Sequence, residues 1–148
     1  MTEPLAIGSN APRFTAATSD GRTVSLDELL EAGPVALFFY PGNDTPGCNR
    51  QLSTVRDELS EFREAGVQPF GVNPASVAAH QKYAAKFEFG FPLLSDADRS
   101  IAGAYNAIKE GGLGIQRTVY AIDRDGKIAF AVRGSPAPAD VIAAVAAS

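Results

Sequence analysis

The chain contains one cysteine, Cys48, at the end of the segment Pro41-Gly42-Asn43-Asp44-Thr45-Pro46-Gly47-Cys48. Thr45 is a good helix N-cap, and Pro46 suits the first helical position, where a backbone N–H is not needed. Cys48 is therefore expected in the first turn of a helix, where free N–H groups and the positive end of the helix dipole favour a thiolate over a thiol. Because the thiolate is the nucleophilic form of cysteine, this segment predicts a reactive sulfur.

Three neighbours of the cysteine complete the predicted site. Gly47 keeps the approach to the backbone open, Pro41 fixes the chain as it leaves the preceding strand, and the Thr45 hydroxyl can point toward the sulfur or toward an oxygen bound beside it. A lone cysteine can also be a small, inert core residue, and Cys48 lies on the apolar stripe of the predicted helix, which is compatible with that alternative. The cap, the prolines and the glycine favour the reactive interpretation, because a core residue needs none of them.

The elements that must position Cys48 alternate between strand and helix. The continuous apolar run at 35–40 predicts a strand buried on both faces. After it, apolar residues at three- and four-residue steps, in register with Cys48, predict one helix that ends at Gly66. Pro69 favours an edge position for the next strand. Further strands are expected at 67–72, 91–94, 118–122 and 127–132, and helices at 26–31, 76–87, 99–105 and 137–147.

This order of elements is that of a thioredoxin-like α/β fold, a central mixed sheet flanked by helices. A right-handed crossover makes the strands at 35–40 and 67–72 parallel. Residues 14–26 alternate around Asp20-Gly21, which predicts a β-hairpin as an N-terminal extension of that core. The 148 residues, of which 45% are hydrophobic, contain no repeat or linker and predict one domain over 1–148.

Composition excludes several function classes. A net charge of -4, a pI near 4.9 and the lack of a basic–aromatic stripe argue against nucleic acid as a partner. No stretch approaches the roughly 20 apolar residues of a membrane span, and the N-terminus does not resemble a secretory signal. One cysteine cannot form an internal disulfide, which favours a cytoplasmic location. With one histidine and no cysteine cluster, neither a metal nor a cofactor is expected.

The cysteine segment resembles the active-site signature of peroxiredoxins, Pro-x-x-x-Thr-x-x-Cys. Its longer form, Asp44-Thr45-Pro46-Gly47-Cys48, resembles the bacterioferritin comigratory protein (PrxQ) subfamily of the AhpC/TSA family. The resemblance extends to Gly8-x-x-Ala11-Pro12-x-Phe14, Phe91-Pro92-Leu93-Leu94-Ser95-Asp96 and Gly114-Ile115-x-Arg117-Thr118-Val119-Tyr120-Ala121-Ile122-Asp123.

The resemblance implies a thiol peroxidase, an antioxidant enzyme of cell redox homeostasis. Cys48 would be the peroxidatic cysteine, whose thiolate attacks a hydroperoxide and becomes a sulfenic acid. Thr45, the N–H groups near Gly47 and Cys48, and an arginine would bind and polarise the substrate, while Pro41 would shield the thiolate from water. Arg117 is the arginine that the resemblance implies.

Topology points to Arg117 as well. In a thioredoxin core the strand at 118–122 runs antiparallel to the strand at 35–40, so its start lies at the edge of the sheet from which the chain leaves for Cys48. Arg56 lies eight residues after Cys48 on the same predicted helix. It could support the site or form a structural salt bridge.

One departure from the family concerns the second half of the reaction. Ser53 stands where many PrxQ proteins carry a resolving cysteine, so the chain resembles a one-cysteine member. The sulfenic acid would then be reduced by an external thiol, on thioredoxin, on glutaredoxin or on a low-molecular-weight compound, or two chains would pair through Cys48. A monomer or a homodimer is compatible with this pattern. A peroxide-sensing redox transducer and a non-catalytic holdase module remain as alternatives.

Other candidates have simpler interpretations. His80 is expected to be a solvated helix residue rather than a catalytic base. Asp96 and Asp98 predict a capped turn rather than a cation site. The glycine-rich segment 111–114 predicts a flexible loop leading to Arg117, because it lacks the Lys-Ser/Thr of a phosphate-binding loop.

Overall fold

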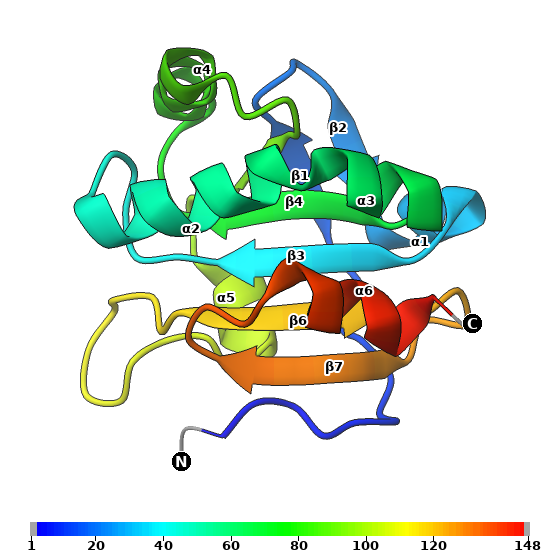
Figure 1. Ribbon diagram of the computed structural model, residues 1–148. Helices are drawn as coiled ribbons and strands as arrows, with labels where there is room; N and C mark the ends of the chain where they lie inside the picture. Colours follow the sequence, from blue (N-terminus) through cyan, green and yellow to red (C-terminus); the bar gives the residue numbers. More distant parts are fainter. Residues whose placement is uncertain (1–2, 147–148) are drawn as a thin grey trace.

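The computed structural model describes residues 3–146 and contains one seven-stranded sheet in the order β2-β1-β5-β4-β3-β6-β7 (Figure 1). The strands are β1 (Thr15–Thr18), β2 (Thr23–Ser25), β3 (Val35–Phe39), β4 (Gln68–Asn73), β5 (Leu93–Ser95), β6 (Thr118–Ile122) and β7 (Ile128–Arg133). The helices are α1 (Leu26–Ala32), α2 (Pro46–Asp57), α3 (Leu59–Ala65), α4 (Val77–Phe87), α5 (Ser100–Ala104) and α6 (Pro138–Val145). No helix among these residues is long and apolar enough to cross a membrane.

The sheet is mixed, as the sequence predicts. β3 pairs in parallel with β4 and β4 with β5, whereas β6 runs antiparallel to both β3 and β7. The predicted N-terminal hairpin is present: β1 and β2 pair around Asp20-Gly21, with Gly21 at a φ of 85° that favours glycine. The hairpin joins the sheet through β5. The thioredoxin-like class is therefore confirmed.

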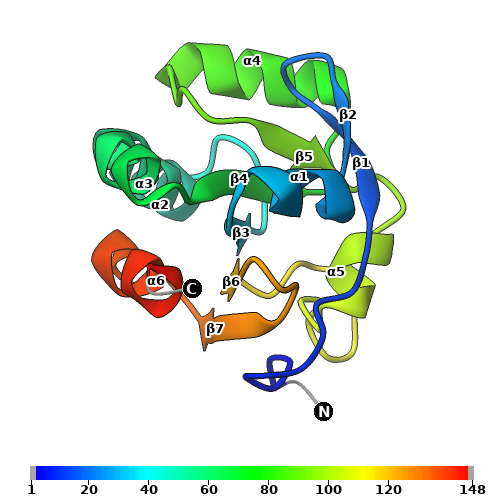
Figure 2. The same ribbon diagram turned by 90° about the vertical axis from the view of Figure 1, so that its right-hand side faces the viewer.

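Helices cover both faces of the sheet (Figure 2). α2, α3, α4 and α6 pack on one face, and α1 and α5 on the other. β3 lies between these layers and is fully buried: Leu37 and Phe39 face the α1 side, while Ala36 and Phe38 face the α2 side. Burying a side chain of the size of leucine or phenylalanine contributes about 1.5–3 kcal/mol, so this run of apolar residues fixes β3 at the centre.

The predicted edge position of the strand with Pro69 is wrong. β4 lies inside the sheet, between β3 and β5. The Gln68 N–H donates to the Pro34 carbonyl on the β3 side, so the Pro69 nitrogen faces the other side. β5 begins only opposite Gly71, and no ladder bond is lost at Pro69. A proline in a strand only requires that no hydrogen-bond acceptor of a neighbouring strand lies opposite its own nitrogen. An inner strand can meet this condition where its neighbour begins further along.

The single helix predicted up to Gly66 is divided into α2 and α3. Glu58 interrupts it with a φ of -110° and a ψ of 21°. Apolar residues on both segments, among them Val55 and Phe62, still pack against the same face of the sheet. The spacing of apolar residues continues across Glu58, so this spacing alone does not predict the break between α2 and α3. Gly66 ends α3 in the left-handed conformation.

Candidate active site

Cys48 is the third residue of α2, directly after the loop that leaves β3. α2 begins at Pro46, and Thr45 precedes it in an extended conformation, as the sequence predicts. The cysteine side chain is fully buried in the cluster between α2 and the sheet. Although Cys48 is packed like a core residue, its sulfur also has a charged partner.

That partner is Arg117, the residue before β6. Phe39 at the end of β3 pairs with Thr118 at the start of β6, so Arg117 lies where the chain leaves β3 for the cysteine loop. Arg117 Nη2 is 3.3 Å from Cys48 Sγ. A Cβ atom on Gly47 would lie 3.3 Å from Arg117 Nη2, so glycine leaves room for the guanidinium. The predicted proximity of Arg117 to Cys48 is confirmed.

Gln51 is a site residue that the sequence interpretation missed. It lies one turn after Cys48 on α2 and is 7% exposed. Its Oε1 accepts a hydrogen bond of 2.5 Å from Arg117 Nη1, and its Nε2 lies 3.5 Å from the Gly134 carbonyl. Gln51 thereby fixes the orientation of the guanidinium without neutralising its charge. A polar residue three positions after a candidate nucleophile was the available signal.

The Thr45 hydroxyl does not point to the sulfur in this structure. It is exposed and donates to the Gly42 carbonyl at 3.2 Å, a local bond of the kind that threonine makes in turns. No side chain of the described residues caps α2. The N–H groups of Gly47 and Cys48 in the first turn are thus not occupied by a side-chain cap. Pro41 is exposed at the start of the same loop.

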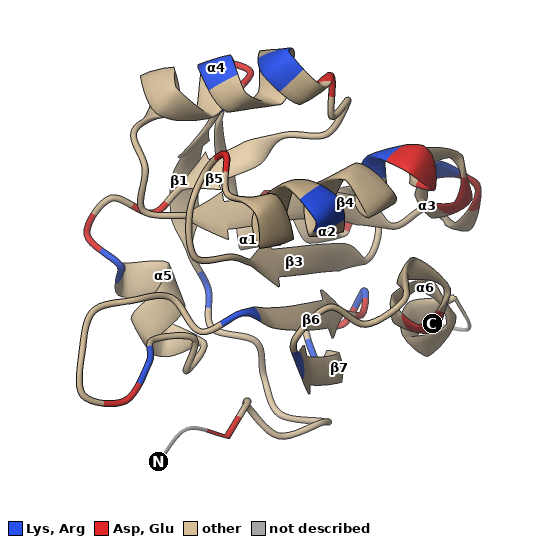
Figure 3. Ribbon diagram, turned by 60° about the vertical axis from the view of Figure 1, so that its left-hand side comes forward, with Lys and Arg blue, Asp and Glu red and all other residues tan. Residues whose placement is uncertain are grey.

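One face of α4 holds this loop. Lys86 Nζ is 2.5 Å from Asp44 Oδ2, and Asp44 Oδ1 accepts from Asn49 Nδ2 at 3.1 Å. The Tyr83 hydroxyl donates to Asn49 Oδ1 at 2.7 Å. The hydrogen bond from Lys86 is the main cause that lowers the pKa of Asp44. Together with His80, Tyr83 and Lys86 form what we call the α4 anchor, and Figure 3 shows the lysines that α4 carries.

The prediction of a solvated His80 is wrong. His80 is fully buried, because α4 turns this residue toward the ends of β4 and β5. Its Nε2 lies 3.2 Å from the Asn73 carbonyl and 3.0 Å from the Leu94 carbonyl, and its Nδ1 lies 3.1 Å from Asn43 Nδ2. Burial lowers the pKa of His80. Helix periodicity alone did not distinguish this face of α4 from the exposed one.

Comparison with known proteins identifies the family. Residues 7–131 match the AhpC/TSA family. The chain belongs to the AhpC/TSA family. It is 38% identical over 130 residues to a putative peroxiredoxin bcp of Coxiella burnetii, covering 84% of this chain and 85% of that protein. It is 33% identical over 124 residues to the chloroplastic peroxiredoxin Q of Oryza sativa subsp. japonica, covering 83% of this chain but only 57% of the rice protein.

The fold agrees with this assignment. The crystal structure of peroxidoxin BcpB from Mycobacterium tuberculosis superposes with a TM-score of 0.88 at 30% identity, covering 97% of each chain. The predicted membership of the bacterioferritin comigratory protein (PrxQ) group and the thiol-peroxidase class are confirmed, whereas the transducer and holdase alternatives gain no support. A peroxide substrate and a thiol reductant follow from membership of this family.

The remaining candidates are structural. Arg56 forms an ion pair with Asp57 and donates to the Phe87 carbonyl at 2.8 Å, which is the salt-bridge alternative. Asp96 accepts from two N–H groups of α5, and Asp98 from Ser100, as expected of a capped turn. Among residues 3–146 no group of three or more His, Cys, Asp or Glu could hold a metal ion.

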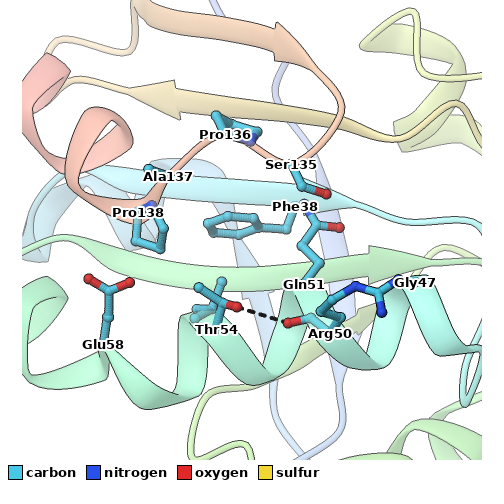
Figure 4. A pocket seen from close by; sticks show the side chains of 11 residues that line it. Phe38, Gly47, Arg50, Gln51, Thr54, Glu58, Ser135, Pro136, Ala137 and Pro138 are labelled. Atoms are coloured by element: carbon cyan, nitrogen blue, oxygen red, sulfur yellow. Dashed lines mark hydrogen bonds between the residues drawn. The ribbon is translucent and has the colours of Figure 1, made fainter.

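A cavity of about 280 Å³ lies beside the site of this AhpC/TSA member (Figure 4). It lies between α2 and residues 135–138, which lead into the first residue of α6. Gly47, Arg50 and Gln51 of α2 line it, as does Glu58, the residue that follows α2. Cys48 does not line it, although Phe38 and Val55 of the buried cluster around Cys48 do.

Proposed function

We propose that the chain reduces hydrogen peroxide or organic hydroperoxides through a sulfenic acid on Cys48. The Cys48 thiolate attacks the terminal oxygen of the hydroperoxide, an S–O bond forms and the O–O bond breaks. The sulfur is oxidised by two electrons, and the leaving alkoxide or hydroxide takes up a proton as an alcohol or water. The observation that carries this proposal is the 3.3 Å distance between Arg117 Nη2 and Cys48 Sγ.

The proposed roles follow from what each group can donate. Arg117 stabilises the thiolate and the charge that develops on the leaving oxygen, because charge-assisted hydrogen bonds are the strongest available to it. The N–H groups of Gly47 and Cys48 point from the helix start, where an anion is favoured. The Thr45 hydroxyl supplies a further donor once it turns from the Gly42 carbonyl, and Pro41 limits the access of water.

The return half of the cycle requires an external thiol. Cys48 is the single cysteine of the sequence, and serine stands at position 53, where the family resemblance implies a resolving cysteine in many members. A first external thiol condenses with the sulfenic acid to a mixed disulfide and water, and a second thiol releases Cys48 as a thiol. We propose thioredoxin, glutaredoxin or a low-molecular-weight thiol as this reductant, acting on a cytoplasmic monomer or homodimer.

The test is to add one equivalent of peroxide to the reduced protein and to measure the intact mass. One added oxygen is expected, and none in Cys48→Ser. Mass equal to two chains joined with loss of two hydrogens would instead show pairing through Cys48. Adding thioredoxin, glutaredoxin or a small thiol in separate reactions identifies the reductant by the disappearance of the added oxygen. An unchanged mass after peroxide would contradict the proposal.

A further inference from the structure

His80 is buried, titratable and not used by the proposed chemistry, yet it is bonded to the catalytic loop. Asn43, at the middle of the loop 41–45, reaches His80 Nδ1 through its Nδ2 at 3.1 Å. Asn43 Oδ1 accepts from the Tyr40 hydroxyl at 2.6 Å. A continuous set of hydrogen bonds therefore joins the end of β3, the loop and α4.

The partners of His80 determine which of its nitrogens carries hydrogen. Nε2 lies beside two carbonyl oxygens, of Asn73 and Leu94, and carbonyls only accept, so Nε2 is protonated. Asn43 Oδ1 already accepts from Tyr40, so the amide turns its NH₂ group to His80. His80 Nδ1 must then be the acceptor. The neutral imidazole with hydrogen on Nε2 satisfies every bond in the set.

A second proton on His80 is incompatible with this arrangement. It would place an N–H group against the Asn43 NH₂, so Asn43 would have to exchange its oxygen and nitrogen. The Tyr40 hydroxyl would then face NH₂ and lose its acceptor, although Tyr40 is fully buried. Protonation of His80 therefore changes the loop as well as the histidine.

The loop depends on such bonds for its conformation. Asp44 adopts a φ of 56°, in the left-handed region that a residue with a Cβ rarely occupies. The Tyr40 carbonyl, at the start of the loop, accepts from Asn73 Nδ2 at 2.9 Å. Asn43 supplies the loop's bond toward the interior, whereas Asp44 makes exposed bonds to Asn49 and Lys86.

We propose that neutral His80 is a positioning residue for peroxide reduction, holding through Asn43 the loop that presents Thr45 and the first turn of α2 beside Cys48. This inference rests on the proposed function of Cys48. The hydrogen-bond partners of His80 are Asn43, Asn73 and Leu94 rather than Cys48, so it acts on the site through Asn43. Proton binding to His80 is expected to slow the oxidation of Cys48.

Tyr40, Tyr83, Asp44 and Asp96 also carry titratable side chains on the elements around His80. Tyr40 and Tyr83 remain neutral, because burial raises the pKa of both phenols. Asp44 remains ionised because Lys86 lowers its pKa. Burial raises the pKa of Asp96, whose N–H shares the Asn73 carbonyl with His80. Asp96→Asn is therefore a necessary control.

The test uses His80 as its own probe, because it is the single histidine of the sequence. Nitrogen NMR of the imidazole reports tautomer and protonation, and rapid mixing with peroxide gives the Cys48 oxidation rate per thiolate over the same pH range. In the unaltered chain we expect the Nε2–H tautomer at neutral pH and a rate that falls as His80 becomes protonated. Asp96→Asn should leave this fall unchanged.

Asn43→Asp is the decisive variant because a carboxylate is isosteric and accepts from protonated His80. The pKa of His80 should rise, and the fall in rate should disappear. Asn43→Leu, which offers His80 no bond, should be slower by about tenfold at every pH. A pH profile of Asn43→Asp that matches the unaltered chain, or a His80 with hydrogen on Nδ1, would overturn the inference. Absence of oxidation in the unaltered chain at every pH would instead overturn the proposed function, with the tautomer unaffected.

Discussion

Two sets of polar residues approach Cys48 from different sides, and they differ in how they reach it. Arg117 precedes the first residue of β6 and makes a hydrogen bond to the sulfur, and Gln51 accepts a second hydrogen bond from its guanidinium. The α4 anchor of His80, Tyr83 and Lys86 is bonded to the loop and to the first turn of α2 rather than to the sulfur, and His80 also bonds to two carbonyls of the sheet. Arg117 places a positive charge beside the sulfur, whereas the α4 anchor holds the position of the loop and of the first turn of α2 through several hydrogen bonds. Substitutions on the two sides should therefore have effects of different size.

The largest effect is expected from Cys48→Ser, which removes the reactive thiol itself. Peroxide consumption should be lost because serine is far less nucleophilic, while the near-isosteric hydroxyl leaves the fold intact. Consumption is measured after addition of peroxide, and folding by thermal unfolding. Ser53→Ala is the matched control on the same helix and should retain the oxidation step. Peroxide consumption by Cys48→Ser at the rate of the unaltered chain would show that Cys48 is not the nucleophile.

Arg117→Ala should slow oxidation by about 10²–10³-fold, in line with the loss of one donor to a developing charge. The free energy of unfolding should change much less than the rate, because the arginine lies at the start of a strand and is only partly buried. Rapid mixing with peroxide measures the rate. Arg124→Ala, at an exposed turn, is the control and should not alter it. Equal oxidation rates for Arg117→Ala and Arg124→Ala would show that Arg117 does not stabilise the charge that develops during the reaction.

Gln51→Ala tests the support of the charged side and should slow oxidation by roughly tenfold, less than removal of Arg117. The guanidinium remains but loses the acceptor that orients it. In the double variant with Arg117→Ala, the Gln51 substitution should add little, because the two residues act as one unit. Additive losses in the four rates would show that Gln51 acts independently of Arg117.

The buried His80 of the α4 anchor predicts that the stability of the fold depends on pH. Burial lowers the pKa of His80 in the folded chain, whereas the unfolded value is 6.5. As the pH falls through 6.5, the unfolded chain binds the proton first, so the free energy of unfolding decreases toward the folded-state pKa. Above 6.5 the stability contribution is complete. Urea titrations at pH 7.5 and 5.5 measure it, and Asn43→Asp, which stabilises protonated His80, should show a smaller decrease.

The smallest effect is expected from Lys86→Ala. The ammonium group is paired with Asp44 at the surface, with side-chain exposures of 60% and 45%, and exposed pairs contribute little. The oxidation rate should change by less than about twofold, in contrast to Asn43→Leu, which removes the bond between the loop and the buried His80. Raising the salt concentration should reproduce the effect of Lys86→Ala. A tenfold loss would show that the exposed bond, rather than the buried one, holds the loop.

What could be predicted from the sequence depended on backbone direction more than on side-chain partners. Strand order placed Arg117 near Cys48, because the start of an antiparallel strand must lie at the end of its neighbour. Gln51 and His80 were missed or misjudged, because the burial of a polar side chain depends on a tertiary partner that the helix pattern does not contain. Pro69 was misplaced for a related reason, since its requirement concerns one neighbouring residue rather than the whole strand.

Ser53 has a mechanical consequence for α2. In a regular helix, residues five apart have Cα atoms roughly 9 Å from one another, beyond the usual 4.4–6.8 Å of a disulfide. A cysteine at 53 could bond to Cys48 only if the helix unwound. With serine there, no internal disulfide requires α2 to unwind, but the Cys48 sulfur is fully buried and must be uncovered before an external thiol can reach it. Local opening of the chain around Cys48 is therefore expected to limit how quickly the thiol reductant returns it to the thiol form, and the amide protons of the first turn of α2 report that opening by hydrogen exchange.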